Sequence, residues 1–373
     1  MTTKITVPTD FSEDFIDELD KINKSDFKNK ISEVYGCLPR SIIGSLRPSK
    51  MLPQVSINGL KRHVEKVHTA NLEFNYTLNS LWINELENTI FGRKKIIDHI
   101  SELVNCGIDR FTIALPFLAR IVRHHFPKIK ISASIVANVS NLFMFKQWVE
   151  YGADRIVISR DLNRSFGILS SMVKLNSASL ELLATSPCLA GCAESCYHGL
   201  VSSAQSSKSY SRNTISNYGR LYCHKYTHQH PSELIKMMWI RPEDLPVYND
   251  LGINYIKIDG RDKTAMYNLE RIRYYCLGEY DGNLLYLLLD DYPKTKSDYL
   301  IGKSNYHAYI DNKRLNGRIS LMAKRNFNCS GQCAECQFKC DELSEEVLEI
   351  QAEWTRSLSE RICFEQNKFF EVE

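Results

Sequence analysis

The sequence lacks the short motifs that identify the commonest enzyme chemistries. It contains no G-x-S-x-G, no H-E-x-x-H, no Walker loop and no G-x-G-x-x-G. These patterns position a serine nucleophile, a zinc ion, a nucleotide phosphate and a dinucleotide, respectively. Their absence removes the usual serine-hydrolase, metalloprotease, P-loop and Rossmann signatures, so any catalytic function must depend on other residues.

Long apolar runs and a strong charge of one sign are also missing. No stretch of eighteen uncharged apolar residues occurs, and the first residues do not combine a basic segment with an apolar core. The formal charge is +3, which gives no argument for nucleic acid by itself but leaves a local basic patch open. With 43% apolar and 24% charged residues, we expect a globular cytoplasmic protein without membrane insertion.

Cysteine, in contrast, is abundant and clustered. Eight of the twelve cysteines fall into two groups of four. Clustered thiols in a reducing cytoplasm are more often metal ligands or catalytic groups than disulfides. The sequence therefore predicts one or two cysteine-bound metal centres, the first at Cys188, Cys192, Cys196 and Cys223, and the second at Cys329, Cys333, Cys336 and Cys340.

The spacing within each group bears on the metal. The first group has no C-x2-C pair of the kind usual in structural zinc sites, and soft thiolates from several loops suit an iron–sulfur cluster better. The second group reads C-x3-C-x2-C-x3-C and contains such a pair, Cys333 with Cys336. Its first three members have the spacing of radical S-adenosylmethionine enzymes, but they come after the last predicted strand instead of the first. For the second group, the sequence therefore leaves two metal centres open, a zinc ion and a second iron–sulfur cluster.

The apolar pattern predicts an α/β fold. Short apolar runs alternate with longer segments whose apolar residues recur every three or four positions, as in parallel strands joined by helices. Three helix–Gly–strand junctions repeat this pattern, with Gly107, Gly152 and Gly252 at the helix ends. We predict a TIM-type (β/α)8 barrel over residues 34–315, a helical extension over 1–33, and a cysteine-rich segment with a terminal helix over 316–373. Seven strands are expected at 72–77, 110–115, 130–135, 155–159, 180–185, 237–240 and 255–258, and an eighth after Arg271.

Active sites of such barrels lie at the carboxyl ends of the strands. The first cysteine group directly follows the strand predicted at 180–185, so we expect it at the barrel mouth. Other polar residues at the ends of predicted strands should also lie at the barrel mouth. The alternative for each of them is a structural role as a strand-end cap or a surface loop residue. They are Asn75, Asn79, Ser134, Asn138, Arg160, Asp161, Arg164, Asp259 and Arg261.

Several stretches resemble the collagenase-like peptidase family U32, over residues 34 to 340. They are residues 181–198, the pair Arg220 and Cys223, residues 239–245 and, most specifically, Gly-Ile-Asn-Tyr-Ile-Lys-Ile-Asp-Gly-Arg at 252–261. The resemblance implies a TIM-like barrel with a 4Fe–4S cluster bound by four cysteines. It also implies oxygen-independent hydroxylation in ubiquinone synthesis or in tRNA and rRNA modification, with prephenate as the hydroxyl source.

The resemblance assigns roles to particular residues. Cys188, Cys196 and Cys223 match three cluster ligands of the family, while Pro246 follows Asp244-Leu245 where several relatives have the fourth. Cys192 is the expected substitute, and the alternative is Cys333 or Cys336 folded over the barrel mouth. We expect the candidate catalytic residues Lys257 and Arg261, together with Arg160 and Arg164, to hold an anionic substrate or donor such as prephenate. The alternative for these basic side chains is a structural ion-pair network.

Two other functions stay open. The first is a peptidase or peptide-tailoring enzyme, in which Cys196 and His198, the third candidate catalytic residue, serve as nucleophile and base. The second is a non-catalytic electron-transfer partner in a heterodimer with a related barrel protein. The substrate stays open among a small molecule, an RNA, a peptide and a carrier-bound group.

Overall fold

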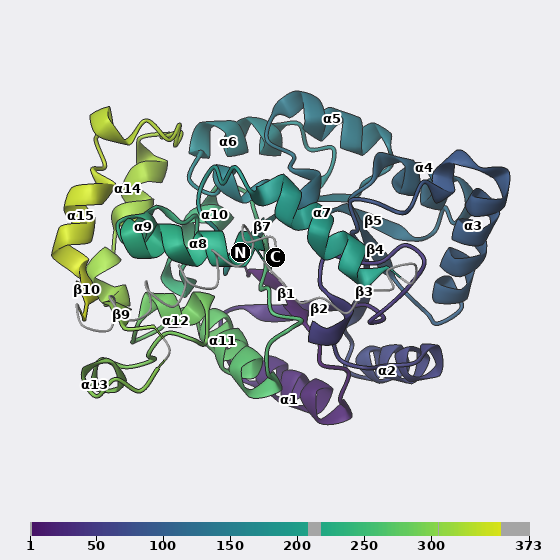
Figure 1. The fold of residues 1–373 in the computed structure, drawn as a ribbon, viewed down its shortest axis with the longest axis horizontal. Coiled ribbons are helices and arrows are strands. Elements are labelled where there is room, and N and C mark those ends of the chain that lie inside the picture. Colours follow the sequence, from purple (N-terminus) through teal and green to yellow (C-terminus); the bar gives the residue numbers. More distant parts are fainter. Residues whose placement is uncertain (1, 208–217, 305, 352–373) are drawn as a thin grey trace, which may run out of the picture.

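Eight parallel strands form a closed barrel surrounded by helices in the computed structural model, which describes residues 2–207, 218–304 and 306–351 (Figure 1). The strands follow one another in chain order, and Lys4 opposite Tyr255 closes the ring between the first and the last. The fold predicted from the sequence is thus confirmed. The strands are β1 (Lys4–Pro8), β2 (Lys30–Gly36), β3 (Glu73–Leu78), β4 (Arg110–Ile113), β5 (Lys130–Ala133), β6 (Arg155–Val157), β7 (Ser179–Leu183) and β8 (Tyr255–Lys257).

The predicted ends of the barrel were wrong. Residues 1–33 are not a helical extension, because they contain β1, the start of β2, and the first crossover helix, α1 (Glu13–Lys24), between them. Residues 237–240 are not a strand, although the Ile240 amide donates to the Ala184 carbonyl at 3.0 Å. Among the described residues after Arg271, no strand enters the barrel. Instead β9 (Ala308–Ile310) pairs antiparallel with β10 (Leu348–Ile350) in a separate two-stranded sheet.

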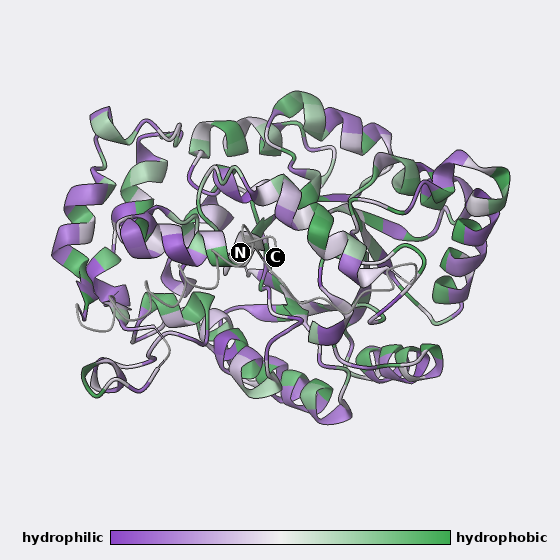
Figure 2. Ribbon diagram, in the orientation of Figure 1, coloured by the Kyte–Doolittle hydropathy of each residue, from purple (hydrophilic) through white to green (hydrophobic). Residues whose placement is uncertain are grey.

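Amphipathic helices form the outer layer. Figure 2 shows apolar and hydrophilic residues alternating around them, and in α2 the buried side chains include Leu60, Val64 and Val67. Gly107, Gly152 and Gly252 have φ of +89°, +94° and +95°, which confirms the three predicted helix–strand junctions. The helices of this layer, with α1, are α2 (Ile57–Thr69), α3 (Ile90–Val104), α4 (Pro116–His125), α5 (Leu142–Glu150), α6 (Phe166–Lys174), α10 (Leu245–Asp250) and α11 (Ala265–Leu277).

A second group of elements lies beside and across the barrel mouth. Figure 1 shows α7 and α8 crossing in front of the strands, with the C-terminal helices gathered on one side. This group has its own apolar cluster, which includes Leu189, Trp239, Leu285 and Ile310. Its helices are α7 (Ser195–Ser206), α8 (Tyr218–Gln229), α9 (Glu233–Lys236), α12 (Leu284–Leu288), α13 (Lys296–Leu300), α14 (Arg318–Lys324) and α15 (Cys340–Val347). The predicted terminal helix begins in α15, and residues 352–373 lie outside the described residues.

Short 3-10 turns complete the described elements. They are η1 (Ser49–Met51), η2 (Leu86–Asn88), η3 (Ile135–Ala137), η4 (Arg160–Leu162), η5 (Pro242–Asp244), η6 (Asn312–Leu315) and η7 (Cys333–Glu335). No helix in the described part of the chain is long and apolar enough to cross a membrane.

The barrel interior is polar and charged, whereas bulky branched apolar residues fill most barrels of this kind. Glu33, which is 1% exposed, accepts hydrogen bonds from Arg110 at 3.0 Å, from Arg155 at 3.2 Å and from Asn75 at 2.8 Å. Arg155 also lies 3.6 Å from Glu181. Burial alone would raise the pKa of Glu33, but Arg155, Arg110, the hydrogen bond from Asn75 and Lys257 together outweigh it and hold that pKa below its usual value. Two carboxylates and two guanidinium groups cancel, so this layer is electrically neutral.

Candidate active site at the barrel mouth

A cavity of about 320 Å³ lies directly above this ionic layer. Since side chains alternate along a strand, the next inward-facing residue of each strand from β2 to β8 forms the floor of the cavity. The floor residues are Tyr35, Thr77, Thr112, Ser134, Val157, Leu183 and Lys257. The loop after β7, with α7 and α8, provides the opposite wall. It contributes Cys188, Cys192, His198 and Cys223.

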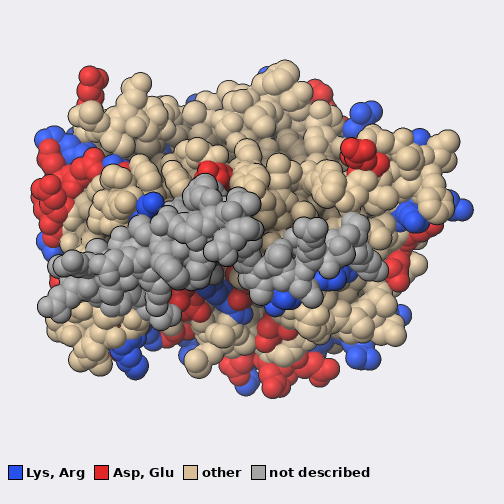
Figure 3. All heavy atoms as spheres, viewed as in Figure 1, with Lys and Arg blue, Asp and Glu red and all other residues tan. Residues whose placement is uncertain are grey.

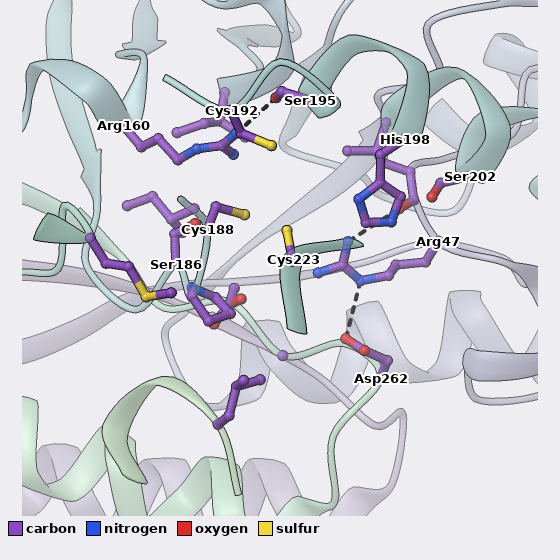
Figure 4. Close-up of a pocket in the computed structure, with 18 of the residues that line it drawn as sticks. Arg47, Arg160, Ser186, Cys188, Cys192, Ser195, His198, Ser202, Cys223 and Asp262 are labelled. Carbon is purple, nitrogen blue, oxygen red and sulfur yellow. Dashed lines mark hydrogen bonds and ion pairs between the residues drawn. The ribbon is translucent and has the colours of Figure 1, made fainter. Parts of the chain in front are cut away.

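Three of the four cysteines predicted to bind a cluster share this cavity. Figure 4 shows the sulfur atoms of Cys188, Cys192 and Cys223 turned toward a common space, with Arg160 beside them. A hydrogen bond between Cys192 and Cys223 lowers the pKa of the Cys192 thiol to about 6 and raises that of Cys223. The electrostatic interaction with Cys188 makes the largest contribution to a raised pKa of Arg160. Asp161, Cys192 and Cys223 act in the same direction, whereas burial acts against them. Cysteines up to 35 positions apart in the chain thus face the same cavity.

Cys196, the fourth predicted ligand, does not line the cavity. It is exposed on the first turn of α7. His198 does line the cavity, and Figure 4 shows its ring close to Arg47 and Ser202. Residues two positions apart on a helix do not face each other. The structure therefore does not form the Cys196–His198 nucleophile–base pair that the peptidase hypothesis required.

The donor set around the cavity fits a cluster better than a single ion. Among the described residues, no three Cys, His, Asp or Glu side chains are arranged to hold one metal ion. An iron–sulfur cluster takes its thiolates at different iron atoms, so its ligands need not converge on one point. Cys188, Cys192 and Cys223 supply three soft donors around one space, which is the chemistry that such clusters require. A cluster held there stays a prediction.

Three basic side chains of the cavity have no carboxylate partner among the described residues. Arg160 donates to the Ser195 hydroxyl at 2.8 Å, and its Nε has no hydrogen-bond partner. Arg261 donates to the Thr77 hydroxyl at 2.6 Å and to the Cys37 sulfur at 2.9 Å. Lys257 has no hydrogen bond at its Nζ, which lies 3.8 Å above the ring centroid of Tyr35.

Other basic residues on the cavity wall are neutralised. Arg47 pairs with Asp262 at 3.1 Å, and this contact overcomes the effect of burial and lowers the pKa of Asp262 to about 2. Lys263 pairs with Asp290 at 2.5 Å. Asp259, also on the wall, pairs with Arg271 at 3.4 Å. The carboxylates of the wall are thus already paired, and the cavity keeps an excess of positive charge from Arg160 and Arg261.

Burial lowers the pKa of Lys257. The nearby carboxylates Glu181 and Glu33 act in the opposite direction, and the cations Arg261 and Arg155 reinforce the lowering. Both carboxylates are already engaged with Arg155, as described above. A buried amine with a lowered pKa spends more of its time neutral than an exposed lysine does.

Several residues predicted at the working end have structural roles instead. Arg164 donates to the carbonyls of Ile235 at 3.0 Å and Met237 at 2.6 Å, and stacks 4.3 Å from the ring of Trp239. It therefore supports the end of the cysteine loop and does not bind a substrate. Asn75 belongs to the ionic layer, Asn138 accepts from Ser159, Asp161 accepts from the Gly191 amide, and the side chain of Arg220 lies outside the described residues.

The C-terminal cysteines lie outside the cavity. The Cys329 amide donates to the Arg164 carbonyl at 3.3 Å, and Cys336 packs against the main core. The Cys340 sulfur accepts from Arg318 at 3.2 Å, while Cys333 begins η7. These four thiols do not form a ligand group within the described residues. Zinc or a second cluster there stays a prediction.

Sequence reasoning missed several cavity residues. Tyr35 was not predicted because β2 was not recognised as a strand, and Arg47 and Asp262 meet only through folding. Cys37, which is 2% exposed and does not line the cavity, accepts a hydrogen bond from Arg261. The alternation Glu33-Val-Tyr35 was the one local signal that could have placed two of these side chains on the inner face.

Comparisons with known proteins agree with this architecture. A protein of Methanocaldococcus jannaschii named as an uncharacterized protease is 27% identical over 90% of this chain and 94% of its own. The tRNA hydroxylation protein P of Helicobacter pylori is 23% identical over 60% of this chain and 54% of its own, and that of Escherichia coli is 34% identical over 26% and 24%. The matched regions thus span about half or less of those two bacterial relatives.

A structural relative shares the fold. The solved structure of a U32 peptidase superposes with a TM-score of 0.51 over 70% of this chain and 94% of its own, at 13% identity. The model of peptidase family U32 matches residues 24–277, which include β2 to β8 and every cysteine of the cavity. This chain belongs to peptidase family U32.

Proposed function

We propose that this protein is an iron–sulfur enzyme that hydroxylates its substrate without molecular oxygen, with an anionic hydroxyl donor of the prephenate type. The observation that carries this proposal is the composition of one cavity. Three thiols and three basic side chains that lack a carboxylate partner in the described parts of the chain share it. Membership of family U32 and the names of the bacterial relatives support the same function.

Each group has a separate task in this proposal. Arg160 and Arg261 bind the carboxylates of the donor through charge-assisted hydrogen bonds, which are strong where water is excluded. His198 lines the same cavity and can carry a proton to or from the bound ligand. Cys188, Cys192 and Cys223 would hold the cluster, which when bound would supply electron transfer.

We propose an RNA as the substrate, with tRNA as the first to be tested. Tyr292, Tyr306 and His224 line the cavity, with the two tyrosine rings 5.3 Å apart, and aromatic groups of this kind stack unpaired bases. Figure 3 shows basic and acidic residues intermixed on the visible face, without a large area of one sign. In this proposal the aromatic groups of the cavity recognise the base.

A peptidase is the second candidate. The archaeal relative named as a protease matches most of the chain, and the cavity combines thiols with the imidazoles of His198, His224 and His228. A thiol beside an imidazole is the arrangement that a cysteine nucleophile requires. A thiol bound to a cluster cannot serve as that nucleophile. Any one cysteine of the cavity can therefore be a cluster ligand or a peptidase nucleophile, but not both.

Replacement of one cavity thiol tests the proposal. Anaerobically purified protein, incubated with prephenate and transcribed tRNA, should add one oxygen atom to a nucleoside, detected by mass spectrometry after digestion. Cys223→Ala should abolish this product, while Cys106→Ala should keep it, because Cys106 is buried at the end of α3 and does not line the cavity. Peptide cleavage by the same preparation, lost in Cys223→Ala and without oxygen addition to tRNA, would instead support the peptidase.

A further inference from the structure

Lys257 occupies an unusual position for a lysine. It is the last residue of β8, it is 7% exposed, and it lies on the floor of the cavity. Its Nζ has neither a hydrogen bond nor an ion pair with any described residue. Charge balance does not explain it, because the two carboxylates below it are matched by Arg110 and Arg155. A protonated amine here would be a buried ion with the face of the Tyr35 ring beside it but no hydrogen bond to a described residue, which is costly.

Such an amine has a known chemical use. Burial, and the proximity of another cation, keep a lysine amine neutral and therefore nucleophilic toward carbonyl groups. Arg261 provides that neighbouring cation, since its guanidinium carbon lies 5.9 Å from the same Tyr35 ring centroid above which Lys257 lies at 3.8 Å. The hydrogen bonds of Arg261 go to neutral partners, Thr77 and Cys37, so its charge is available to an anion.

We propose that Lys257 forms a Schiff base with a 2-oxo acid whose carboxylate is bound by Arg261. In a 2-oxo acid the carbonyl carbon is bonded directly to the carboxylate carbon. When Arg261 binds the carboxylate, the adjacent carbonyl carbon therefore lies beside the Lys257 amine. The Nζ attacks this carbon, a C–N bond forms, and the carbonyl oxygen leaves as water with both amine hydrogens. No oxidant or reductant is consumed in this step.

The Schiff base would form in the same cavity as the proposed hydroxylation. Each of the two proposals can hold without the other. A prephenate-type donor carries both a carboxylate and a 2-oxo acid group. A Schiff base would hold such a donor covalently below the three thiols and leave its second carboxylate for Arg160. A structural role of Lys257 over Tyr35 predicts no covalent adduct at all.

Borohydride trapping tests the inference. The full-length protein is incubated with phenylpyruvate and then reduced with sodium borohydride, which delivers hydride to the imine carbon and leaves a stable secondary amine. The intact mass should rise by the mass of the ligand less one oxygen atom, and peptide mapping should locate the increase at Lys257. Phenyllactate, which has a hydroxyl in place of the carbonyl, should give no increase.

Matched variants complete the experiment. Lys257→Met and Lys257→Arg should both lose the adduct, although arginine keeps the charge, while Lys263→Met should keep it, because Lys263 lines the same cavity but is paired with Asp290. Thermal melting verifies that each variant is folded. The inference is overturned if the wild type gives no adduct, or if the adduct persists in Lys257→Met. An adduct without tRNA hydroxylation would contradict the proposed function alone, and hydroxylation without an adduct would contradict this inference alone.

Discussion

Arg261→Met should weaken the binding of prephenate by roughly 30- to 1000-fold, which corresponds to about 2–4 kcal/mol. Arg261 is 7% exposed and, within the part of the chain that the structure describes, has no carboxylate to neutralise it. A bound carboxylate would therefore gain a charge-assisted hydrogen bond with little competition from water. Isothermal titration calorimetry under anaerobic conditions measures the dissociation constant directly.

Lys263→Met is the matched control for Arg261→Met. Lys263 lines the same cavity, but its charge is already satisfied by Asp290, so its removal should change the affinity by less than about threefold. Equal losses in the two variants would show that the cavity attracts anions only through its total charge. No loss in either variant would contradict an anion site at Arg261.

Glu33→Gln should destabilise the barrel by about 3–5 kcal/mol, the usual cost of removing one partner from a buried ion pair. The side chain keeps its shape but no longer neutralises Arg110 and Arg155, both of which are almost fully buried. Glu73→Gln is the control, because the Glu73–Lys130 pair is largely exposed and should contribute less than about 1 kcal/mol. The shift of the urea midpoint, read by circular dichroism, measures both effects. Equal urea midpoints for the two variants would contradict a stabilising role of Glu33 in the ionic layer.

The pH dependence of the unfolding free energy should distinguish the wild type from Glu33→Gln. The pKa of Glu33 lies below its ordinary value of 4.5 in the folded protein. A carboxylate with a lowered folded-state pKa contributes stability that is fully present above the unfolded-state pKa and is lost as the pH falls through the folded-state value. The difference in stability between wild type and Glu33→Gln should therefore be constant above about pH 5 and shrink below pH 4.5.

Strands β3 to β8 could be predicted from the sequence, and β1 and β2 could not. Strands β3 to β8 alternate with amphipathic helices, and Gly107, Gly152 and Gly252 mark the junctions before β4, β6 and β8, so this pattern is visible locally. Strand β2 reads Lys-Ile-Ser-Glu-Val-Tyr-Gly, and Glu33 interrupts the apolar pattern because it faces the ionic interior. Residues that form a charged barrel centre satisfy one another only across strands, which no local pattern reveals.

The candidate site was predicted where the chain itself brings groups together. Cys188 and Cys192 follow β7 directly, and Lys257 and Arg261 lie at the end of β8, so the strand direction alone places all four at the mouth. Which residues complete the site depends on the packing of α7 and α8. That packing turns His198 inward and leaves Cys196 exposed, although both lie on the same helical turn.

The iron and acid-labile sulfide content of the anaerobically purified protein tests the central claim most directly. We expect about four irons and four sulfides per chain in the wild type and in Cys106→Ala, as for one 4Fe–4S cluster. Cys188→Ala and Cys223→Ala should lose both elements, because each removes a thiol of the cavity. Wild-type protein that contains zinc but no sulfide, or cavity variants that keep their full iron content, would contradict a cluster at the barrel mouth.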